Sequence, residues 1–432
     1  MSSKICECQP SAYMQQPTDI VILSNGPGEV ATWVRPVVRG LAQVLGPQMQ
    51  QVRISVLLSP CPHSTGREAA IAISYPEVDR VLSASDFWAF LLRGKTRDNW
   101  HWHQRGIVVF LGGDQFYTIA VSKRLGYSSL IYAEWDARWY RFVDYFAAMN
   151  QKVIERVPKH YQQKFTLVGD LMADVALEVD EQTTLNQDAP LIGLLVGSKP
   201  AKLFQGVPLC LAIAEKIQQI NPQARFIIPV APTLDLTTLS NYANRQHNPL
   251  ISSLGNVEGK LITETATQVS HLITSGGTKI ELITEFPAYK TLVNCQLCLT
   301  TVGANTAELT ALKVPMIVLL PTQQLDAMRS WDGLPGILAN LPGLGTAFAR
   351  LINWLVLKQG RLFAWPNIWA GEEIVPELIG KLEPEIIAKL VLDYLAHPSK
   401  LQIMRDHLTA VGGQTGAAKQ IADIIKQEIT KT

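Results

Sequence analysis

The sequence predicts an α/β protein built from two doubly wound parallel sheets. Short apolar segments rich in β-branched residues alternate with longer helical patterns, and this alternation is typical of parallel strands covered by helices on both faces. One series of such segments occupies each half of the chain, and the polar stretch 180–189 separates the two series. These observations predict two domains that each have their own sheet.

The expected strands follow directly from the apolar segments. In the first half they are DIVILS from Asp19, RISVLLS from Arg53, IVVFLGG from Ile107, SLIYAEW from Ser129 and FTLVGD from Phe165. In the second half they are LIGLLVGS after Pro190, RFIIPVA from Arg225, HLITSGG from His271, LCLTTVG from Leu297 and PMIVLLP from Pro315. All are of strand length. None approaches the roughly 18 apolar residues that crossing a bilayer requires, so no membrane span is expected.

The same pattern predicts the domain boundaries. Residues 1–18 are expected to form a flexible tail, 19–182 the first Rossmann-like domain and 190–382 the second. Residues 383–432 indicate helices broken at His397-Pro398 and Gly412-Gly413, which pack on the first domain or on a partner subunit. Because ligands bind beyond the carboxyl ends of parallel strands, two domains facing a cleft would have their chemistry in the loops after the strands.

The composition excludes several classes of function. Hydrophobic residues make up 47% of the chain and charged residues 17%, which argues against disorder. With 38 Lys and Arg against 37 Asp and Glu, the net charge of +1 argues against a nucleic-acid-binding protein. Six scattered cysteines indicate a reducing, cytoplasmic setting. The Cys295 and Cys298 pair is interpreted as part of a buried strand, and no metal site is expected.

Two acidic residues follow strands of the first half. Glu29 stands at the start of a helix, after Gly26 and Gly28, where it could act in catalysis or simply interact with the helix dipole. Asp114 follows IVVFLGG, where it could accept a proton from a hydroxyl nucleophile or cap the next helix. The residues alone leave both alternatives open.

One loop of the second half has the character of a phosphate-binding turn. Gly197, Ser198 and Lys199 follow a buried strand, and their backbone amides and the lysine could receive a phosphate. The spacing is not that of a Walker A motif, which argues against nucleotide hydrolysis of that type. An ordinary turn with an exposed lysine explains the same residues equally well.

The segment LCLTTVGANTAELTALKVPMIVLL is more informative. Gly303, Ala304, Asn305 and Thr306 lie between a strand and a helix, where bare amides could bind a diphosphate. Glu308 lies one turn further, where its carboxylate could accept hydrogen bonds from ribose hydroxyls. The alternative is that Asn305 or Thr306 simply caps the helix.

Residues 86–105 interleave aromatic and aliphatic side chains with basic ones. Such a mixture suits the interface of an anionic membrane, where rings lie at headgroup depth and cations meet phosphates. A core helix followed by a solvated loop is the alternative. The segment therefore indicates a candidate peripheral membrane contact.

In this order, the landmarks resemble the lipid-A-disaccharide synthase family and its divergent related branch. These GT-B glycosyltransferases transfer GlcNAc from a UDP donor to a lipid-linked glucosamine. The resemblance covers about residues 19–410. It depends on four segments. FTLVGDLMADV at 165–175 is similar to the family's FxGHPLAD stretch, and GSK at 197–199 to its GS(R/K) turn. VGANTAE at 302–308, followed by KVPMIV, is similar to SGTATLE, and WPNIWAGEEIVPELI at 365–379 to LPNLLAGxxxVPEL.

The resemblance implies a role for each matching position. The 303–306 loop would face the donor diphosphate, and Glu308 would hold the ribose. The further donor residues that it implies are Asn367, Gly371 and Glu372 or Glu373. Asp114 matches the first acid of the family's GxDxPDF motif, where the catalytic base is sought. Gly28 and Glu29 match the Gly-Glu of its SGEASGD loop.

The departures from the family fall mainly in the first half. They are Tyr117 for the second acid of GxDxPDF, Ala31, Thr32 and Trp33 for the end of the N-terminal loop, Asp170 for the His of GHPLAD and Lys199 for Arg. Because the donor-side motifs match better than the acceptor-side motifs, a changed acceptor is the simplest explanation.

The resemblance implies an inverting transferase that uses UDP-GlcNAc or another UDP-hexose, without a metal or other cofactor. Asp114, or failing that Glu29, would deprotonate the hydroxyl of a lipid or lipid-linked sugar at the inner face of a membrane. A homodimer with exchanged C-terminal segments is a further expectation. Two alternatives stay open: a UDP-sugar epimerase on the same fold, and a nucleotide-sugar-binding protein without catalysis.

Overall fold

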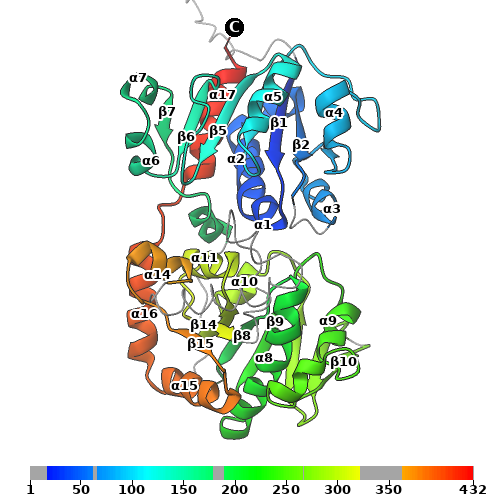
Figure 1. Cartoon of the computed structure of the whole chain (residues 1–432), viewed down its shortest axis with the longest axis vertical. Coiled ribbons are helices and arrows are strands. Elements are labelled where there is room, and N and C mark those ends of the chain that lie inside the picture. The colour runs from blue at the N-terminus through cyan, green and yellow to red at the C-terminus, as the bar shows by residue number, and fades with distance from the viewer. Residues whose placement is uncertain (1–16, 62–65, 179–188, 266, 322–361, 432) are drawn as a thin grey trace, which may run out of the picture. The chain divides into compact units, whose positions relative to one another are not determined.

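The computed structural model describes residues 17–61, 66–178, 189–265, 267–321 and 362–431 (Figure 1). It forms two compact units, of which unit 1 contains Met1–Asp174 with Gln414–Thr432 and unit 2 contains Val175–Gly413. Residues 1–16 of the expected tail and 179–188 of the expected linker lie outside the described residues. Each unit contains a sheet of its own.

The sheet of unit 1 has seven parallel strands in the order β3-β2-β1-β4-β5-β6-β7. They are β1 Thr18–Ser24, β2 Val52–Leu58, β3 Arg80–Leu82, β4 Arg105–Phe110, β5 Ser128–Ala133, β6 Tyr145–Ala148 and β7 Phe165–Leu167. The central strand β1 is apolar along its middle, where Ile20, Val21 and Ile22 are fully buried. A strand covered on both faces requires such a continuous apolar run.

The helices of unit 1 connect these parallel strands. They are α1 Pro27–Glu29, α2 Arg35–Leu45, α3 Glu68–Ile73, α4 Phe87–Arg93, α5 Phe116–Leu125, α6 Gln151–Glu155, α7 Lys159–Gln162 and the C-terminal α17 Ala417–Ile429. A π-helical turn, Val30–Val34, joins α1 to α2. Short 3₁₀ turns lie at Gly46–Gln51 and Ala173–Glu178.

The C-terminal helix α17 packs beside α2 within unit 1, where its red ribbon lies among blue and cyan elements (Figure 1). Its apolar face is buried along its length, including Ile421 and Ile425. The Asp174 carboxylate accepts hydrogen bonds from the amides of Gly416 and Ala418 at the helix start. Gly40 of α2 allows this close approach, because a Cβ there would lie 3.0 Å from the Ala418 carbonyl oxygen.

The sheet of unit 2 has eight strands in the order β10-β11-β12-β9-β8-β13-β14-β15. They are β8 Leu191–Leu195, β9 Arg225–Pro229, β10 Gly259–Thr263, β11 Ser270–Thr274, β12 Lys279–Ile283, β13 Leu297–Thr301, β14 Met316–Pro321 and β15 Glu377–Gly380. The six strands from β12 to β15 in this order are parallel. They confirm the second doubly wound half.

One predicted parallel strand is antiparallel. The HLITSGG segment forms β11, which runs antiparallel to both β10 and β12. Only Ser275–Thr278 separates β11 from β12, and a connection this short can form a hairpin but cannot cross over to a parallel neighbour. The expectation of a parallel βαβ unit is therefore wrong at this edge of the sheet.

The longest helix in the described residues, α8, belongs to unit 2. The helices of this unit are α8 Pro200–Ile220, α9 Leu236–Tyr242, α10 Tyr289–Leu292, α11 Ala304–Ala311, α14 Trp365–Ala370, α15 Pro384–Ala396 and α16 Pro398–Val411, with a 3₁₀ turn at Pro249–Ser253. The chain breaks between α15 and α16 at His397-Pro398, as expected. Cys295 and Cys298 are buried and unbridged, which confirms that they belong to the core around β13.

Candidate functional site

Two strand-to-helix loops of unit 2 lie side by side. Strands β8 and β13 are parallel neighbours, with Leu195 opposite Thr300, so their carboxyl ends meet at one edge of the sheet. The loop after β8 contains Gly197, whose φ is 86°, and the loop after β13 contains Gly303, whose φ is 137°. Both values favour glycine, because a side chain would strain the backbone there.

Lys202, which is not among the residues predicted from the sequence, lies between these two loops. It belongs to the first turn of α8, and its ammonium group donates a hydrogen bond to the Val302 carbonyl oxygen at 2.5 Å. Burial lowers the pKa of Lys202 to about 8, with a further contribution from Lys199. The signal that could have identified it is the second lysine of GSKPAK, three residues after Lys199.

The predicted residues of the first loop occupy the start of α8. Gly197 and Ser198 are half-buried and Lys199 is exposed at the N-cap position, with its backbone extended. The structure thus brings the amides of this turn to the β8–β13 edge. Binding of a phosphate by Ser198 or Lys199 stays a prediction.

The predicted residues of the second loop begin α11. Ala304 is exposed and Asn305 is half-exposed, whereas Thr306 is buried. The Thr306 hydroxyl donates to the Gly303 carbonyl oxygen at 2.9 Å and accepts a hydrogen bond from the Trp365 amide at 3.2 Å. The Thr306 side chain is therefore used within the first turn of α11 and in joining α11 to α14, and it does not cap the helix. This leaves Asn305 as the polar side chain of the loop that a ligand could reach.

Glu308 lies one turn into α11. Burial raises the pKa of its carboxyl group to about 7. Within the described residues no side chain or amide forms a hydrogen bond with this carboxylate. A partly buried carboxylate without partners is suited to accept hydrogen bonds from the hydroxyl groups of a ligand.

Asn367 of α14 is fully buried, and its side-chain amide forms hydrogen bonds with other residues of unit 2. Its Nδ2 donates to Val375 O and to Glu377 Oε1, while its Oδ1 accepts from the amides of Ile374 and Val375. These bonds shape the turn that contains Gly371, Glu372 and Glu373. The structure therefore shows Asn367 as a positioning residue for that turn.

The turn itself follows α14. Gly371 ends the helix with a φ of 77° and its amide bonds the Asn367 carbonyl oxygen at 2.9 Å. The side chains of Glu372 and Glu373 are exposed. A contact between either carboxylate and a donor stays a prediction.

The two acids predicted in unit 1 lie after β1 and β4, which are neighbouring parallel strands. A Cβ at Gly26 would overlap the Glu29 carboxylate, and one at Gly112 would lie 3.1 Å from its Cβ, so both glycines leave room for this side chain. Asp114 is exposed, and its Oδ1 accepts the Phe116 amide hydrogen at 2.9 Å. Asp114 therefore stabilises the start of α5, while its second carboxylate oxygen forms no hydrogen bond within the described residues.

Glu134 is an acid of unit 1 that sequence reasoning missed. It follows β5 directly, and its pKa is raised to about 8 by burial and by the charges of Asp170 and Glu29, although a hydrogen bond from Trp135 opposes the shift. The pKa of Asp170 is also raised, mainly by burial. A signal was present, because SLIYAEW has an acid just after a buried strand, as IVVFLGGD does.

The predicted membrane segment 86–105 has two structural roles in unit 1. Phe87 and Phe90 are fully buried in the core. The guanidinium of Arg80 lies over the rings of Trp100 and Trp102, at 4.2 Å and 4.4 Å from their centres. These four aromatic side chains therefore stabilise the fold, and much of the segment matches the alternative of a core helix with a loop.

Other apolar side chains of unit 1 are exposed near this segment. Trp88 and Leu92 of α4 are 48% and 70% exposed, and Phe116, Trp139 and Phe142 are exposed as well. Ring contacts connect Trp88 through Tyr117 to Phe116 and Trp139. We call Trp88, Leu92, Phe116, Trp139 and Phe142 the aromatic surface. The exposed cations near it are Arg93, Lys123 and Arg124.

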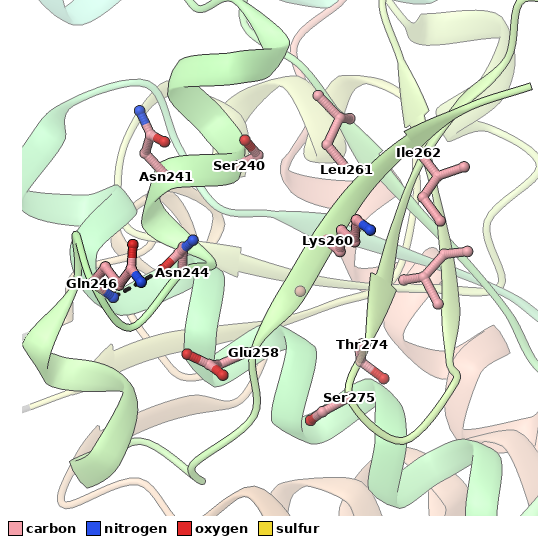
Figure 2. Close-up of a pocket in the computed structure, with 12 residues that line it drawn as sticks. Ser240, Asn241, Asn244, Gln246, Glu258, Lys260, Leu261, Ile262, Thr274 and Ser275 are labelled. Atoms are coloured by element: carbon pink, nitrogen blue, oxygen red, sulfur yellow. Dashed lines mark hydrogen bonds between the residues drawn. The ribbon is translucent and has the colours of Figure 1, made fainter.

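A separate cavity of about 740 Å³ lies beside the edge of the unit 2 sheet, between α9 and the β10–β11 hairpin (Figure 2). Its lining includes Asn241 and Asn244 of the α9 region, Lys260 of β10 and Thr274 of β11. None of the residues predicted from the sequence lines it. Strands β11, β12 and β9 separate β10 from β8 in the sheet, so this cavity is distinct from the β8–β13 edge.

Two further properties concern the described ranges alone. No group of three or more His, Cys, Asp or Glu side chains in them has an arrangement that could hold a metal ion. None of the helices in the same ranges combines the length and apolar character needed to cross a membrane.

Comparisons of sequence point to one family, although no family profile matches the chain. The lipid-A-disaccharide synthase of Xylella fastidiosa strain M23 is 26% identical over 274 residues, which cover 60% of this chain and 58% of the relative. That of Anaeromyxobacter dehalogenans strain 2CP-1 is 26% identical over 237 residues, 54% of this chain and 48% of the relative. The chain thus spans about half the length of the curated relatives it matches.

Comparisons of structure concern the fold. A protein described as a UDP-N-acetylglucosamine 2-epimerase from Listeria monocytogenes has a TM-score of 0.50 at 14% identity, covering 96% of this chain and 98% of its own. MnaA from S. aureus, solved with UDP, has a TM-score of 0.50 at 12% identity, covering 95% and 96%. The chain therefore has a GT-B-type α/β fold, and its sequence is similar to lipid-A-disaccharide synthases, as the motifs predict.

Proposed function

We propose that the chain is an inverting glycosyltransferase that moves a sugar from a UDP-sugar to a lipid or lipid-linked sugar. The observation that supports the donor most directly is the β8–β13 edge of unit 2, where two glycine loops and two helix N-termini meet around a lysine. Backbone amides at helix N-termini attract the phosphates of a nucleoside diphosphate. The curated relatives are named lipid-A-disaccharide synthases, which supports transfer to a lipid acceptor.

The donor would use unit 2. The diphosphate would lie against the backbone of the Gly197 and Gly303 loops, and the ribose would meet the unpartnered carboxylate of Glu308. Positive partial charge at the helix N-termini would stabilise the leaving UDP, without requiring a metal ion. The MnaA structure was solved with UDP, which supports a uridine nucleotide for a protein of this fold.

The acceptor would use unit 1. Asp114 has one carboxylate oxygen without a hydrogen bond in the described residues, and with Glu29 it is our candidate for the general base. Exposed rings near cations suit the boundary between lipid tails and anionic headgroups, so we propose that the aromatic surface contacts a membrane. We further propose a cytoplasmic location, at the inner face of a membrane, and keep the homodimer as a prediction.

Thermal denaturation with a panel of nucleotides tests the donor assignment. The panel consists of UDP, UDP-GlcNAc, UDP-glucose, UDP-galactose and GDP-mannose. A ligand present at one hundred times its Kd adds about 2.7 kcal/mol to the free energy of unfolding. UDP compounds are expected to raise the Tm of the wild type, and Asn305→Ala and Glu308→Ala to remove most of that shift. Folded protein that no nucleotide stabilises would contradict the proposal.

A UDP-sugar epimerase is the second candidate, because a solved protein with this fold is described as a UDP-N-acetylglucosamine 2-epimerase. The two functions differ in their need for an acceptor. Incubation with UDP-GlcNAc alone would yield its 2-epimer from an epimerase, whereas a transferase would consume the donor only when a lipid acceptor is added. Binding of UDP with neither reaction would indicate a nucleotide-sugar-binding protein.

A further inference from the structure

Lys202 differs from the other predicted donor residues in how its side chain is held. Its aliphatic stem lies against Gly197, where a Cβ would be 3.0 Å from Lys202 Cδ. Its ammonium lies against Gly303, where a Cβ would be 3.0 Å from Lys202 Nζ. Both glycines leave the space that this side chain crosses. The lysine thus runs from one loop of the β8–β13 edge to the other.

The ammonium group has an incomplete set of partners. It donates one hydrogen bond, to the Val302 carbonyl oxygen, and within the described residues no carboxylate lies within 4.0 Å of it. An ammonium group has three hydrogens to donate. Desolvation without a counter-ion disfavours the charged form of a lysine. A bound anion would supply both the missing charge and the missing acceptors.

A second group at the same place also lacks a partner. Thr301, the last residue of β13, is 5% exposed, and its hydroxyl forms no hydrogen bond within the described residues. This hydroxyl faces the first loop, because a Cβ on Gly197 would lie 3.4 Å from it. Buried hydroxyl groups are ordinarily hydrogen-bonded, so an unused one at the loop that the Lys202 stem contacts indicates a site for an acceptor of hydrogen bonds.

Lys199 offers a clear contrast. It has the position of the family's arginine, but its side chain is exposed at the N-cap of α8. An exposed ammonium is strongly hydrated and gains little from a single ionic contact. A half-buried ammonium gains more, because the local dielectric is lower.

We propose that Lys202, with the Thr301 hydroxyl, binds the diphosphate of the nucleotide donor, and that Lys199 contributes less. This inference rests on the proposed donor site and names the cation within it. Lys202 neutralises phosphate charge between the two glycine loops, next to the N-terminal amides of α8 and α11. Charge-assisted hydrogen bonds of this kind are the stronger ones in proteins.

Calorimetric titration with UDP and with uridine separates the diphosphate from the base and ribose. Lys202→Met keeps the length of the side chain and removes its charge, and we expect it to weaken UDP binding about 10- to 100-fold with uridine binding unchanged. Lys199→Met should weaken UDP binding by a smaller factor. Lys216→Met, an exposed lysine on the same helix, is the inert control.

The outcomes distinguish this inference from the proposed function. If the wild type binds no UDP, the donor assignment fails. If the wild type binds UDP and Lys202→Met binds it equally well, or if Lys199→Met has the larger effect, only the role of Lys202 is overturned. Circular dichroism checks that each variant is folded, and no loss of stability is expected, since Lys202→Met removes a buried charge without a counter-ion.

Proton uptake by the wild type gives a readout that needs no variant. The pKa of free Lys202 is about 8, and a bound diphosphate would raise it. Its charged neighbour is Lys199, whereas Thr301, Val302 and Gly303 opposite it do not titrate. Titrations at pH 8.5 in buffers of different ionisation enthalpy should therefore show uptake of protons with UDP and none with uridine. Equal values for the two ligands would contradict the proposal.

Discussion

Units 1 and 2 have the same doubly wound architecture and differ in the charge of the loops beyond their strands. In unit 2 the β8 and β13 loops present glycines, helix N-termini and the ammonium of Lys202. In unit 1 the loops after β1, β5 and β7 present Glu29, Glu134 and Asp170, and burial raises the pKa of the last two. One backbone arrangement thus positions glycine loops and a lysine in one unit and acidic side chains in the other. The loop residues decide which chemistry each sheet serves.

The largest effect is expected from a deletion that unfolds unit 1 and leaves unit 2 folded. Unit 1 needs two distant parts of the chain, whereas unit 2 is continuous. Deleting residues 414–432 removes α17, whose buried face includes Ile421 and Ile425, and should unfold unit 1 while unit 2 keeps its structure. Hydrogen exchange followed by mass spectrometry would show lost protection in β1 and retained protection in β8.

Gly40→Leu is the milder form of this test. A side chain there would press on the backbone of α17 at Ala418, and overpacking of this kind costs about 1–3 kcal/mol. Gly28→Ala is the matched control, because no atom lies within 4 Å of a Cβ at that position. For the deletion of residues 414–432 described above, full protection of β1 from hydrogen exchange would show that α17 is dispensable for the fold of unit 1.

The next test compares one glycine from each unit. Gly303→Ala places a side chain at a φ of 137°, 3.0 Å from Lys202 Nζ, and should weaken UDP binding about tenfold or more. Gly113→Ala strains the loop after β4, where φ is 102°, and should lower the Tm without changing UDP affinity. Calorimetry and thermal denaturation of both variants measure the two effects. Equal loss of UDP affinity in both would end the distinction between the units.

A smaller effect is expected at the aromatic surface of unit 1. The double variant Trp88→Ser, Leu92→Ser removes two exposed apolar groups and should reduce binding to phosphatidylglycerol vesicles about three- to tenfold. Ile403→Ser is the control, because Ile403 is an equally exposed apolar residue of unit 2. Sedimentation with anionic and with neutral vesicles gives the measurement. Unchanged binding by the double variant would remove the aromatic surface from the proposal.

The smallest effect concerns the acids of unit 1. The folded-state pKa of Glu134 is about 8, above the ordinary value of 4.5, so between these values the folded state binds more protons than the unfolded state. Its contribution to stability therefore falls as pH rises from about 4.5 to 8. Glu134→Gln should raise the Tm by a few degrees at pH 9 and by much less at pH 5, since each 1 kcal/mol of stability shifts the Tm of a domain of this size by about 2–4 °C. Glu155→Gln, at an exposed position, is the control.

Much of the fold could be predicted from the sequence, because the central strands are continuous apolar runs. The strands around Ile20 and Leu299 are examples, since both residues are fully buried and both segments were predicted. The short strands β3, β6, β10, β12 and β15 and the antiparallel pairing of β11 were not predicted. Short strands have little apolar pattern, and pairing direction depends on the length of a connection rather than on composition.

The candidate site could be predicted in part. The turns at Gly197 and Gly303 were found because glycine and small polar residues after a buried strand form a local pattern. Lys202 and Glu134 were missed, since their significance comes from burial and from neighbours that are distant in the chain. The same reason explains Asn367, whose motif was recognised while its buried hydrogen bonds to Val375 and Glu377 were not.

The sequence by itself determined the two doubly wound halves and the similarity to lipid-A-disaccharide synthases, because strand periodicity and motif spacing are local properties. Only the tertiary structure decided that α17 completes unit 1 and that Phe87 and Phe90 belong to its core. It alone brought the ammonium of Lys202 into contact with Val302, which is 100 residues further along the chain. Burial and charge depend on which segments meet in space, and packing of the whole chain sets that.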